Sequence, residues 1–268
     1  MIRASFYAER VRTVRDWALT IPFLVAFGLC LAVFDVAGRV VRPFSLRAFE
    51  AVMAALQRSL MATFRICGTR VVVERSSGVA AHTGYVIISN HQSMFDIALI
   101  GGILFTNYPK YVAKRELGRW IPAISLNLRR GGNALIDRGD RHQAVAAIDE
   151  MAREAQRRGV SVVIFPEGRR SRDGEPGRFH RLGTVGLLRA ADRLPVIPVT
   201  VDGSWRLLRH NLLPVPFGTT VRIHFGEPLP RSPDDAKQIA AAAEERIRKQ
   251  LAAWQEAADV AARRAGPA

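Results

Sequence analysis

The residues best suited to chemistry are His91 and Asp96, in the stretch NHQSMFDI at residues 90–97. They are too far apart to be neighbours on one helical face, but Asn90 ends an apolar strand-like run, so a turn can bring the two side chains together. An imidazole beside a carboxylate is a general-base pair, because the carboxylate fixes the tautomer while the other ring nitrogen takes a proton. The alternative is structural: Ser93 and Asp96 form a capping-box-like S-x-x-D before an apolar helix. These residues alone leave both interpretations open.

A second polar cluster, FPEGRRS at residues 165–171, also follows a strand-like run. Glu167, Arg169 and Arg170 surround Gly168 at the carboxyl end of that run, where open α/β sheets place ligand sites. Arginine matches phosphate oxygens with its fork of donors, and glycine lets the backbone approach a ligand closely. The cluster therefore indicates either a phosphate site or a β-turn with solvated charges.

Two further stretches are weaker signals when each is taken singly. GGNALIDR at residues 131–138 brings Arg138 after a short apolar run. VIPVTVDGSW at residues 196–205 is strand-like but carries Pro198, which a central strand usually excludes.

The chain after Gly68 alternates short β-rich runs with helical patterns. Six runs indicate strands, at residues 70–75, 84–89, 110–113, 160–165, 195–201 and 220–225. An amphipathic helix is predicted over residues 141–159 and a solvated helix over residues 233–264, the latter with Ser232 as its candidate cap. The pattern predicts an α/β fold with a mixed, largely parallel sheet covered by helices, forming one domain at residues 68–268.

The N-terminal part, residues 1–67, is predicted to be a membrane-embedded helical segment. Residues 17–34 contain no charged side chain over eighteen positions, which is the lower end of what spans a bilayer. A second helical pattern follows at residues 45–68, with arginines among its apolar residues. The two helices fit either a hairpin embedded in one leaflet or one spanning helix followed by an ordinary core helix.

The charge of the chain indicates an anionic partner, since Lys and Arg outnumber Asp and Glu by 39 to 24. Membrane phospholipid fits better than nucleic acid, because the sequence has no zinc-finger, helix-turn-helix or RNA-recognition signature. The two cysteines, Cys30 and Cys67, indicate no disulfide framework, and the six histidines show no metal-ligand spacing, so no metal site is predicted.

The four stretches, in this order and at these separations, resemble the blocks of the glycerolipid acyltransferase family, and most closely those of the 1-acylglycerol-3-phosphate acyltransferases. NHQSMFD matches N-H-x-x-x-x-D, GGNALIDR matches G-N-x-x-I-D-R, FPEGRRS matches F-P-E-G-T-R-S, and VIPV matches V-P-V. The stretches YVAKREL and WIPAI, at residues 111–117 and 120–124, also resemble the family's segment between its first two blocks. The resemblance covers roughly residues 68–230.

The resemblance implies a role for each residue of the matching blocks. His91 is the general base and Asp96 its orienting partner. The implied substrate-binding residues are Asn90, Lys114, Asn133, Arg138, Glu167, Gly168, Arg169, Arg170 and Pro198. One departure is Arg169, which stands where the family usually has Thr and adds charge beside the phosphate site.

The resemblance also implies a reaction and its partners. His91 takes the proton from the free hydroxyl of lysophosphatidic acid as that oxygen attacks an acyl thioester, carried by coenzyme A or by acyl carrier protein, with no cofactor. We expect the protein at the inner (cytoplasmic) membrane, with its active site at the cytoplasmic face. Two alternatives stay open: a sister acyltransferase for another lysolipid, such as a lysophospholipid or an ornithine-lipid precursor, and a membrane-attached binding protein without enzymatic activity.

Overall fold

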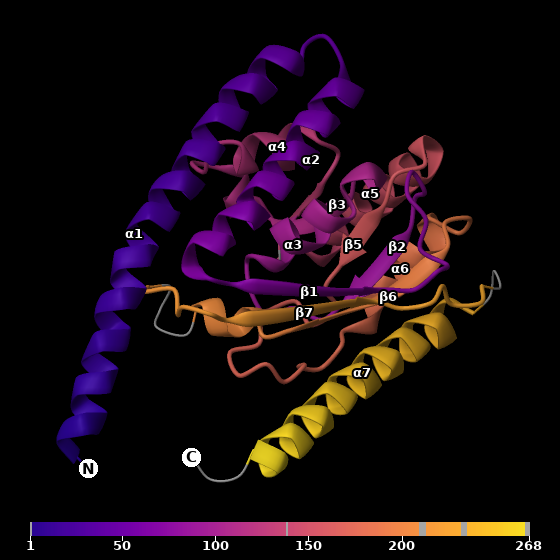
Figure 1. The fold of residues 1–268 in the computed structure, drawn as a ribbon. Helices are drawn as coiled ribbons and strands as arrows, with labels where there is room; N and C mark the ends of the chain where they lie inside the picture. The colour runs from indigo at the N-terminus through magenta and orange to yellow at the C-terminus, as the bar shows by residue number, and fades with distance from the viewer. Residues whose placement is uncertain (1, 138, 209–212, 232–234, 266–268) are drawn as a thin grey trace.

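The sheet is the centre of the computed structural model, which describes residues 2–137, 139–208, 213–231 and 235–265 (Figure 1). Its seven strands lie in the order β1-β7-β6-β2-β5-β3-β4. They are β1 (Arg70–Arg75), β2 (Val86–Ser89), β3 (Lys110–Lys114), β4 (Ala134–Ile136), β5 (Val162–Ile164), β6 (Val196–Asp202) and β7 (Thr220–Phe225). All pairings are parallel except that of β6 with β7, so the predicted mixed, largely parallel sheet is confirmed. The six predicted strands form, and β4 is an additional strand that was not predicted.

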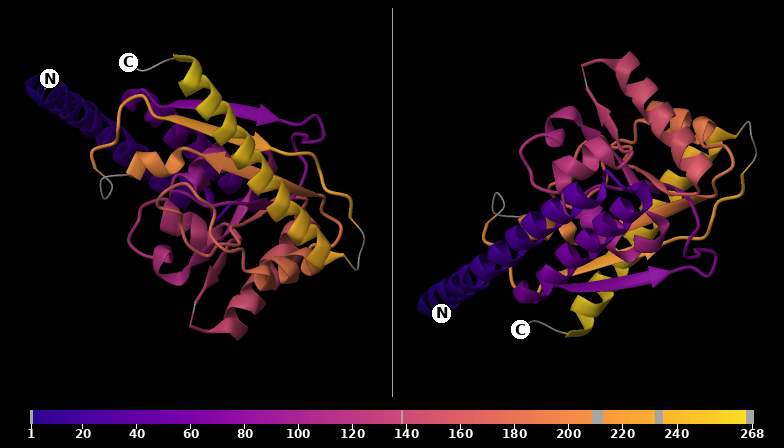
Figure 2. Two further views of the ribbon diagram at one scale, coloured as in Figure 1. Left: turned by 90° about the horizontal axis from the view of Figure 1, so that it is seen from below. Right: turned by 90° about the horizontal axis from the view of Figure 1, so that it is seen from above.

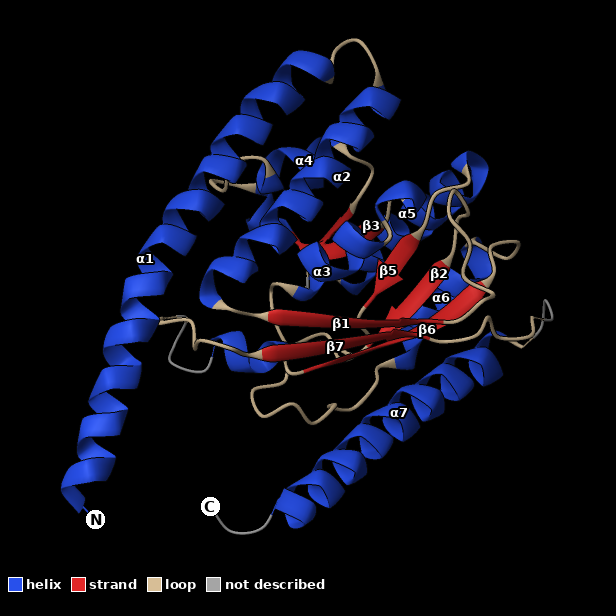
Figure 3. Ribbon diagram, viewed as in Figure 1, coloured by secondary structure: helices blue, strands red, loops and turns tan. Residues whose placement is uncertain are grey.

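Helices cover both faces of the sheet (Figures 2 and 3). The α-helices are α1 (Ile2–Val41), α2 (Leu46–Thr63), α3 (Asp96–Ile103), α4 (Ile124–Arg130), α5 (Arg141–Arg158), α6 (Arg181–Ala190) and α7 (Ala236–Ala265). Short 3₁₀ turns are η1 (Phe64–Cys67), η2 (Phe105–Asn107), η3 (Arg115–Gly118) and η4 (Ser204–Leu208). Seen from below, α7 crosses one face of the sheet; seen from above, α1 and α2 lie across the other (Figure 2).

The central strand β2 shows why the sheet needs both helical layers. Its side chains alternate, so Val86 and Ile88 pack into the core formed with α5, α6 and α7, while Ile87 packs into the core formed with α1 and α3. Every residue of β2 is buried. A parallel strand covered on both faces is expected to be continuously apolar, which is the pattern that the sequence carries here.

Helix ends agree with the sequence where the structure describes them. Asp140 caps α5 by accepting a hydrogen bond from the Gln143 N–H at 2.9 Å, and Gly159 ends the helix in a left-handed conformation, φ 63°. The long C-terminal helix α7 also forms, starting at Ala236. The cap expected for it, Ser232, lies outside the described residues.

Pro198 lies in the inner strand β6, where a proline is unusual. Its carbonyl accepts a hydrogen bond from the Gly226 N–H at 2.9 Å, on the β7 side of the strand. The missing N–H points to the same side, and pairing with β7 begins only at Val199. The proline is therefore tolerated because it stands where the antiparallel ladder ends.

The N-terminal helices form a hairpin that packs on the sheet domain (Figure 1). The segment Arg12–Val41 of α1 is long and apolar enough to cross a membrane by length and composition. The buried face of α2, which includes Phe49, Met53 and Leu56, packs with residues of α3 and α4 as well as with α1. The division of the chain into domains at residues 67 and 68 stays a prediction.

Hydrogen bonds fix α1 to the sheet domain along most of its length. They join Asp16 Oδ1 to Phe217 N at 3.2 Å, Thr20 Oγ1 to Val215 N at 2.9 Å and Asp35 Oδ1 to Ala123 N at 2.7 Å. Directly after the helix, Arg42 Nε donates to the Arg130 carbonyl at 3.0 Å. The helix is therefore docked lengthwise rather than by one end.

Candidate active site

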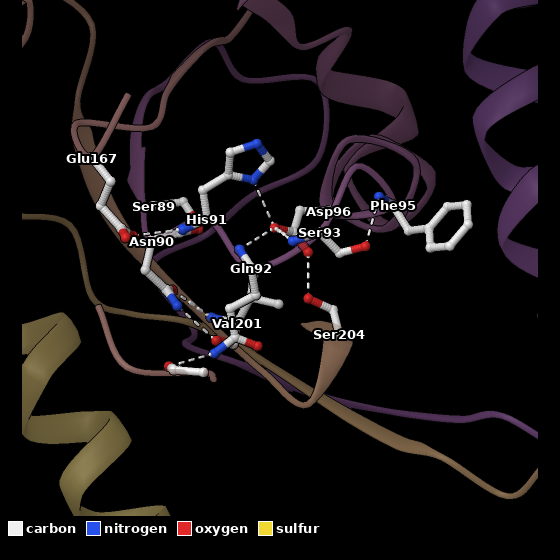
Figure 4. A network of polar contacts seen from close by, with 11 residues as sticks. Ser89, Asn90, His91, Gln92, Ser93, Phe95, Asp96, Glu167, Val201 and Ser204 are labelled. Atoms are coloured by element: carbon white, nitrogen blue, oxygen red, sulfur yellow. Dashed lines mark hydrogen bonds and ion pairs between the residues drawn. The ribbon is translucent and has the colours of Figure 1, made fainter. Parts of the chain in front are cut away.

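His91 and Asp96 meet at the carboxyl end of β2, where five parallel strands end at one edge of the sheet (Figure 4). His91 Nδ1 lies 2.8 Å from Asp96 Oδ2. The Asp96 side chain is fully buried, and the His91 side chain retains 16% exposure. Figure 4 shows the other ring nitrogen of His91 pointing away from the carboxylate. The geometry is that of a general base whose Nε2 can receive a proton while Asp96 holds Nδ1.

The turn between the two residues also begins a helix. Asp96 Oδ2 accepts hydrogen bonds from the Gln92 N–H at 2.7 Å and the Ser93 N–H at 2.8 Å, and Ser93 Oγ accepts one from the Phe95 N–H at 3.2 Å. The structural interpretation therefore does not compete with the chemical one, because the carboxylate oxygen that accepts from the turn before α3 also lies against the imidazole; the catalytic role of the pair stays a prediction.

Sequence reasoning missed Ser204, which completes the shell of the carboxylate. Its hydroxyl donates a hydrogen bond to Asp96 Oδ1 at 2.6 Å, and both residues are buried. The turn that places it is Gly203, with φ +84°, where a Cβ would lie 2.3 Å from the Thr220 carbonyl oxygen. The signal for it in the sequence is a Gly-Ser pair one residue beyond the strand predicted at residues 195–201.

The His91 ring stacks on Phe165, the first residue after β5. The two ring centroids lie 4.1 Å apart, with an angle of 20° between the planes. This contact limits the rotation of the imidazole about its side-chain bonds. The orientation of His91 is thus set from two sides, by a hydrogen bond and by an aromatic face.

Glu167 links the His91 turn to the loop that follows β5. Its Oε1 accepts a hydrogen bond from the His91 N–H at 2.8 Å, and its Oε2 accepts one from the Gly177 N–H at 2.8 Å. The residue is buried, and burial raises its pKa although the two backbone donors oppose the shift. Each oxygen is thus engaged by a backbone amide, and the acceptor-recognition role that the resemblance implies for Glu167 stays a prediction.

Three of the basic residues expected around the phosphate follow or end strands on the same side of the sheet as His91, at the carboxyl ends of β3 and β5. Gly168 has φ +66°, a left-handed conformation that favours glycine, and it turns the chain so that Arg169 and Arg170 are exposed. Lys114 is exposed at the carboxyl end of β3. Arg138 lies outside the described residues.

Two of the expected substrate-binding residues have side chains that form hydrogen bonds with the protein backbone. The Asn90 side chain donates to the Val201 carbonyl and accepts from the Val201 N–H, both at 2.8 Å, which ties β2 to β6. Asn133 Oδ1 accepts from the Tyr111 N–H at 2.9 Å, and its Nδ2 donates to the Asn127 carbonyl at 2.8 Å. Their roles toward substrate stay predictions, as does that of the strand residue Pro198.

Within the part of the chain that the structure describes, no group of three or more His, Cys, Asp or Glu could hold a metal ion.

Fold and site together define an α/β protein with a histidine–carboxylate base at the carboxyl edge of its sheet. A family model described as Acyltransferase matches residues 70–202. This confirms the resemblance that the four blocks indicated, and the chain carries a domain of the acyltransferase family.

Curated relatives and a solved structure agree with this family. The 1-acyl-sn-glycerol-3-phosphate acyltransferase of Cocos nucifera is 32% identical over 155 residues, covering 56% of this chain and 47% of the relative. That of Escherichia coli (strain K12) is 28% identical over 151 residues, covering 54% of this chain and 58% of the relative. The chain thus spans about half the length of these relatives. The crystal structure of the 1-acyl-sn-glycerophosphate (LPA) acyltransferase of Thermotoga maritima has the same fold, with a TM-score of 0.74, 23% identity and coverage of 91% of this chain and 98% of that chain.

Proposed function

We propose that this protein is a membrane acyltransferase that moves a fatty acyl group from a thioester to the free hydroxyl of 1-acylglycerol-3-phosphate, giving phosphatidic acid. The observation that carries the proposal is the 2.8 Å contact between His91 Nδ1 and Asp96 Oδ2 inside a domain of the acyltransferase family. The names of the matched relatives support this acceptor.

The reaction proceeds by direct transfer. His91 Nε2 removes the proton of the acceptor hydroxyl as its oxygen attacks the thioester carbonyl, and the carbon–oxygen bond forms. Asp96 stabilises the imidazolium that results. Collapse of the tetrahedral intermediate breaks the carbon–sulfur bond, and His91 returns the proton to the leaving thiolate. The products are the acylated acceptor and a free thiol, so atoms and charge balance.

The substrates are recognised by the basic residues at the carboxyl ends of the parallel strands. The acceptor phosphate binds near Arg169 and Arg170, whose guanidinium groups match phosphate oxygens. The acyl donor is acyl-CoA or acyl-acyl carrier protein. Because Arg169 replaces the family's usual Thr, a sister activity on another lysolipid is the second candidate.

The membrane arrangement favoured by the fold is a hairpin in one leaflet, at the cytoplasmic face of the inner membrane. Bonds to the sheet domain extend from Asp16 to Arg42, the residue after α1, so the bonded part of the helix, from Asp16 to Val41, is about 38 Å long at 1.5 Å per residue. A hydrocarbon core is about 30 Å thick. A spanning α1 would therefore carry the attached sheet domain into the bilayer, where polar loops are not tolerated. The anionic cytoplasmic leaflet also complements the net charge of +15.

An acyl-transfer assay on membranes containing the wild type or His91→Ala tests the activity. Lysophosphatidic acid and lysophosphatidylcholine serve as parallel acceptors, with palmitoyl-CoA and palmitoyl-acyl carrier protein as donors. We expect activity with lysophosphatidic acid that the substitution lowers by about 10²- to 10⁴-fold, the contribution of a general base. Full activity of His91→Ala would overturn the mechanism, and a preference for lysophosphatidylcholine would overturn the acceptor assignment.

A further inference from the structure

A groove of about 760 Å³ lies between α2 and the edge strand β1, away from the His91 turn. Its lining combines three arginines, Arg58, Arg65 and Arg70, with apolar side chains that include Met61, Val71 and Ile103. Pockets for small ligands commonly have volumes of about 300–1,000 Å³ and a few polar groups on an apolar lining. The groove therefore has the size and composition of a ligand site.

The described residues leave the positive charge of the groove without a neutralising partner. No ion pair of Arg58, Arg65 or Arg70 forms within residues 2–137, 139–208, 213–231 and 235–265. Arg58 instead lies over the Phe105 ring, 4.1 Å from its centroid. Three guanidinium groups around one groove complement an anion with several oxygens, for which phosphate is the chemistry that arginine matches best.

A buried hydroxyl in the groove wall is an independent sign of a missing partner. Thr69 lines the groove and is 5% exposed, yet among the described residues its Oγ1 has no hydrogen-bond partner. Buried polar groups are nearly always hydrogen-bonded, and an unpaired hydroxyl costs about 1–3 kcal/mol. The Oγ1 atom is itself enclosed, so a phosphate or ester oxygen in the groove would satisfy it once the Thr69 side chain turns toward the groove.

The apolar helices and exposed valines beside the groove favour a membrane lipid as the molecule that carries this phosphate. The groove is bordered by α2, which packs against the apolar helix α1 (Figure 1). Val72 and Val73 of β1 are exposed beside it. In the sheet, β7 and β6 separate β1 from β2, so at about 4.8 Å per strand β1 lies roughly 14 Å from the strand that His91 follows.

We infer that the groove between α2 and β1 binds a diacyl phospholipid of the bilayer, at a site separate from the catalytic residues. The arginines hold the phosphate, Thr69 donates to it or to an adjacent ester, and the acyl chains lie along Met61, Val71 and Ile103. A lipid held there fixes the angle at which the domain sits on the leaflet. This site does not depend on the acyl-transfer activity proposed above.

Lipid retention by the full chain in neutral detergent tests this inference, with phosphatidylglycerol as the probe and native mass spectrometry as the readout. We expect Arg65→Glu with Arg70→Glu to lower the apparent affinity for phosphatidylglycerol at least fivefold. The matched control, Arg189→Glu with Arg193→Glu, makes the same change of net charge at exposed positions elsewhere and is expected to bind like the wild type. Equal retention by both double variants would overturn the inference.

Further binding experiments distinguish a phospholipid in the groove from other ligands. Diacylglycerol, which lacks the phosphate, is expected to bind at least fivefold more weakly, and millimolar inorganic phosphate is expected not to displace phosphatidylglycerol. Full displacement by phosphate, or a lipid-independent dimer that the charge reversal dissociates, would instead assign the groove to a free anion or to a second copy of the chain. Should the Glu double variant not fold, Arg65→Gln with Arg70→Gln replaces it, with the same direction of effect.

Thr69→Val gives a second, independent measurement. The substitution keeps the shape of the side chain and removes only the unpaired hydroxyl, so the melting temperature is expected to stay constant or rise while lipid affinity falls severalfold. A lower melting temperature with unchanged affinity would show that the hydroxyl serves the fold. The His91→Ala chain is expected to retain lipid like the wild type, so this test can fail without affecting the proposed activity.

Discussion

Ser204 donates a hydrogen bond from its hydroxyl to Asp96 Oδ1 over 2.6 Å, so both oxygens of this buried carboxylate are held while only Oδ2 faces His91. The two residues are 108 positions apart in the chain. We therefore expect Ser204 to be a positioning residue, which acts on the imidazole through Asp96.

Ser204→Ala is expected to lower kcat about tenfold or more, with little change in the KM of either substrate. A hydrogen bond to a charged group contributes about 1.5–3 kcal/mol, and the variant leaves the carboxylate free to turn away from His91. The control is Ser125→Ala, which removes another buried, hydrogen-bonded hydroxyl, in α4. If both variants lose the same stability and the same kcat, Ser204 has only a structural role.

Asp96→Asn is expected to keep the fold and lose most activity. The amide oxygen can still accept from the Gln92 and Ser93 N–H groups, and the amide nitrogen can donate to Ser204. The negative charge that stabilises the imidazolium is gone, and loss of such a partner can lower kcat by up to about 10⁴-fold. Circular dichroism and the melting temperature check the fold, and an acyl-transfer assay checks kcat. Near-normal kcat in a folded variant would remove Asp96 from the mechanism.

The features that the sequence predicts well depend on residues that lie close together in the chain. The contact between His91 and Asp96 depends on a turn within six residues, and β2, β5 and α5 follow from apolar periodicity and from end signals such as Gly159. What it missed joins distant segments. Nothing in the sequence pairs Ser204 with Asp96, because that contact depends on β2 and β6 lying side by side. The strand β4 is a short apolar run between an asparagine and an aspartate, with one β-branched residue where β5 has three.

Roles carried over from matching blocks show the same limit. Asn90 stands inside the first block, but its amide is engaged by the backbone of Val201 on a neighbouring strand. A motif records which residue is required at a position, and it does not record whether that residue meets substrate or holds a strand. Only the three-dimensional neighbours separate these two possibilities.

Glu167→Gln tests whether this residue positions the active-site loops or recognises the acceptor. Both carboxylate oxygens accept from backbone N–H groups, whereas a Gln side chain would direct its NH₂ group at one of those donors. We expect a loss of about 1–3 kcal/mol in stability, as for a buried amide left unpaired, and a fall in kcat. An acceptor KM that rises severalfold at unchanged kcat and melting temperature would instead assign Glu167 to acceptor recognition.

The lengthwise docking of α1 predicts that both of its ends lie on the same side of the membrane. In a Cys30→Ser background, single cysteines are placed at Arg12 and at Phe44, both exposed. Cys67 is a poor competitor for label, because it is buried and burial raises the pKa of its thiol to about 11. A membrane-impermeant maleimide added to sealed inverted vesicles is expected to label both positions. Labelling of only one of them would show that α1 spans the bilayer.

The hairpin is also joined to the sheet domain by a buried ion cluster around Glu50 of α2. Glu50 pairs with Lys110 of β3, which is buried, and with Arg158 of α5, whose Nη2 lies 2.6 Å from Glu50 Oε2. Removing one partner of a buried ion pair leaves an uncompensated charge. Such a loss typically costs about 3–5 kcal/mol.

Glu50→Gln is therefore expected to lower the melting temperature of the detergent-solubilised protein strongly, because it leaves the buried Lys110 ammonium without its ion-pair partner. The double variant Glu50→Met with Lys110→Met is expected to recover most of this loss, since an apolar pair of similar volume avoids the desolvation cost of two charges. The control is Asp149→Asn, which affects an ion pair with the exposed Arg153 and should change stability by less than about 1 kcal/mol. A double variant no more stable than Glu50→Gln would show that the cluster contributes net stabilising charge interactions to the docking of α2.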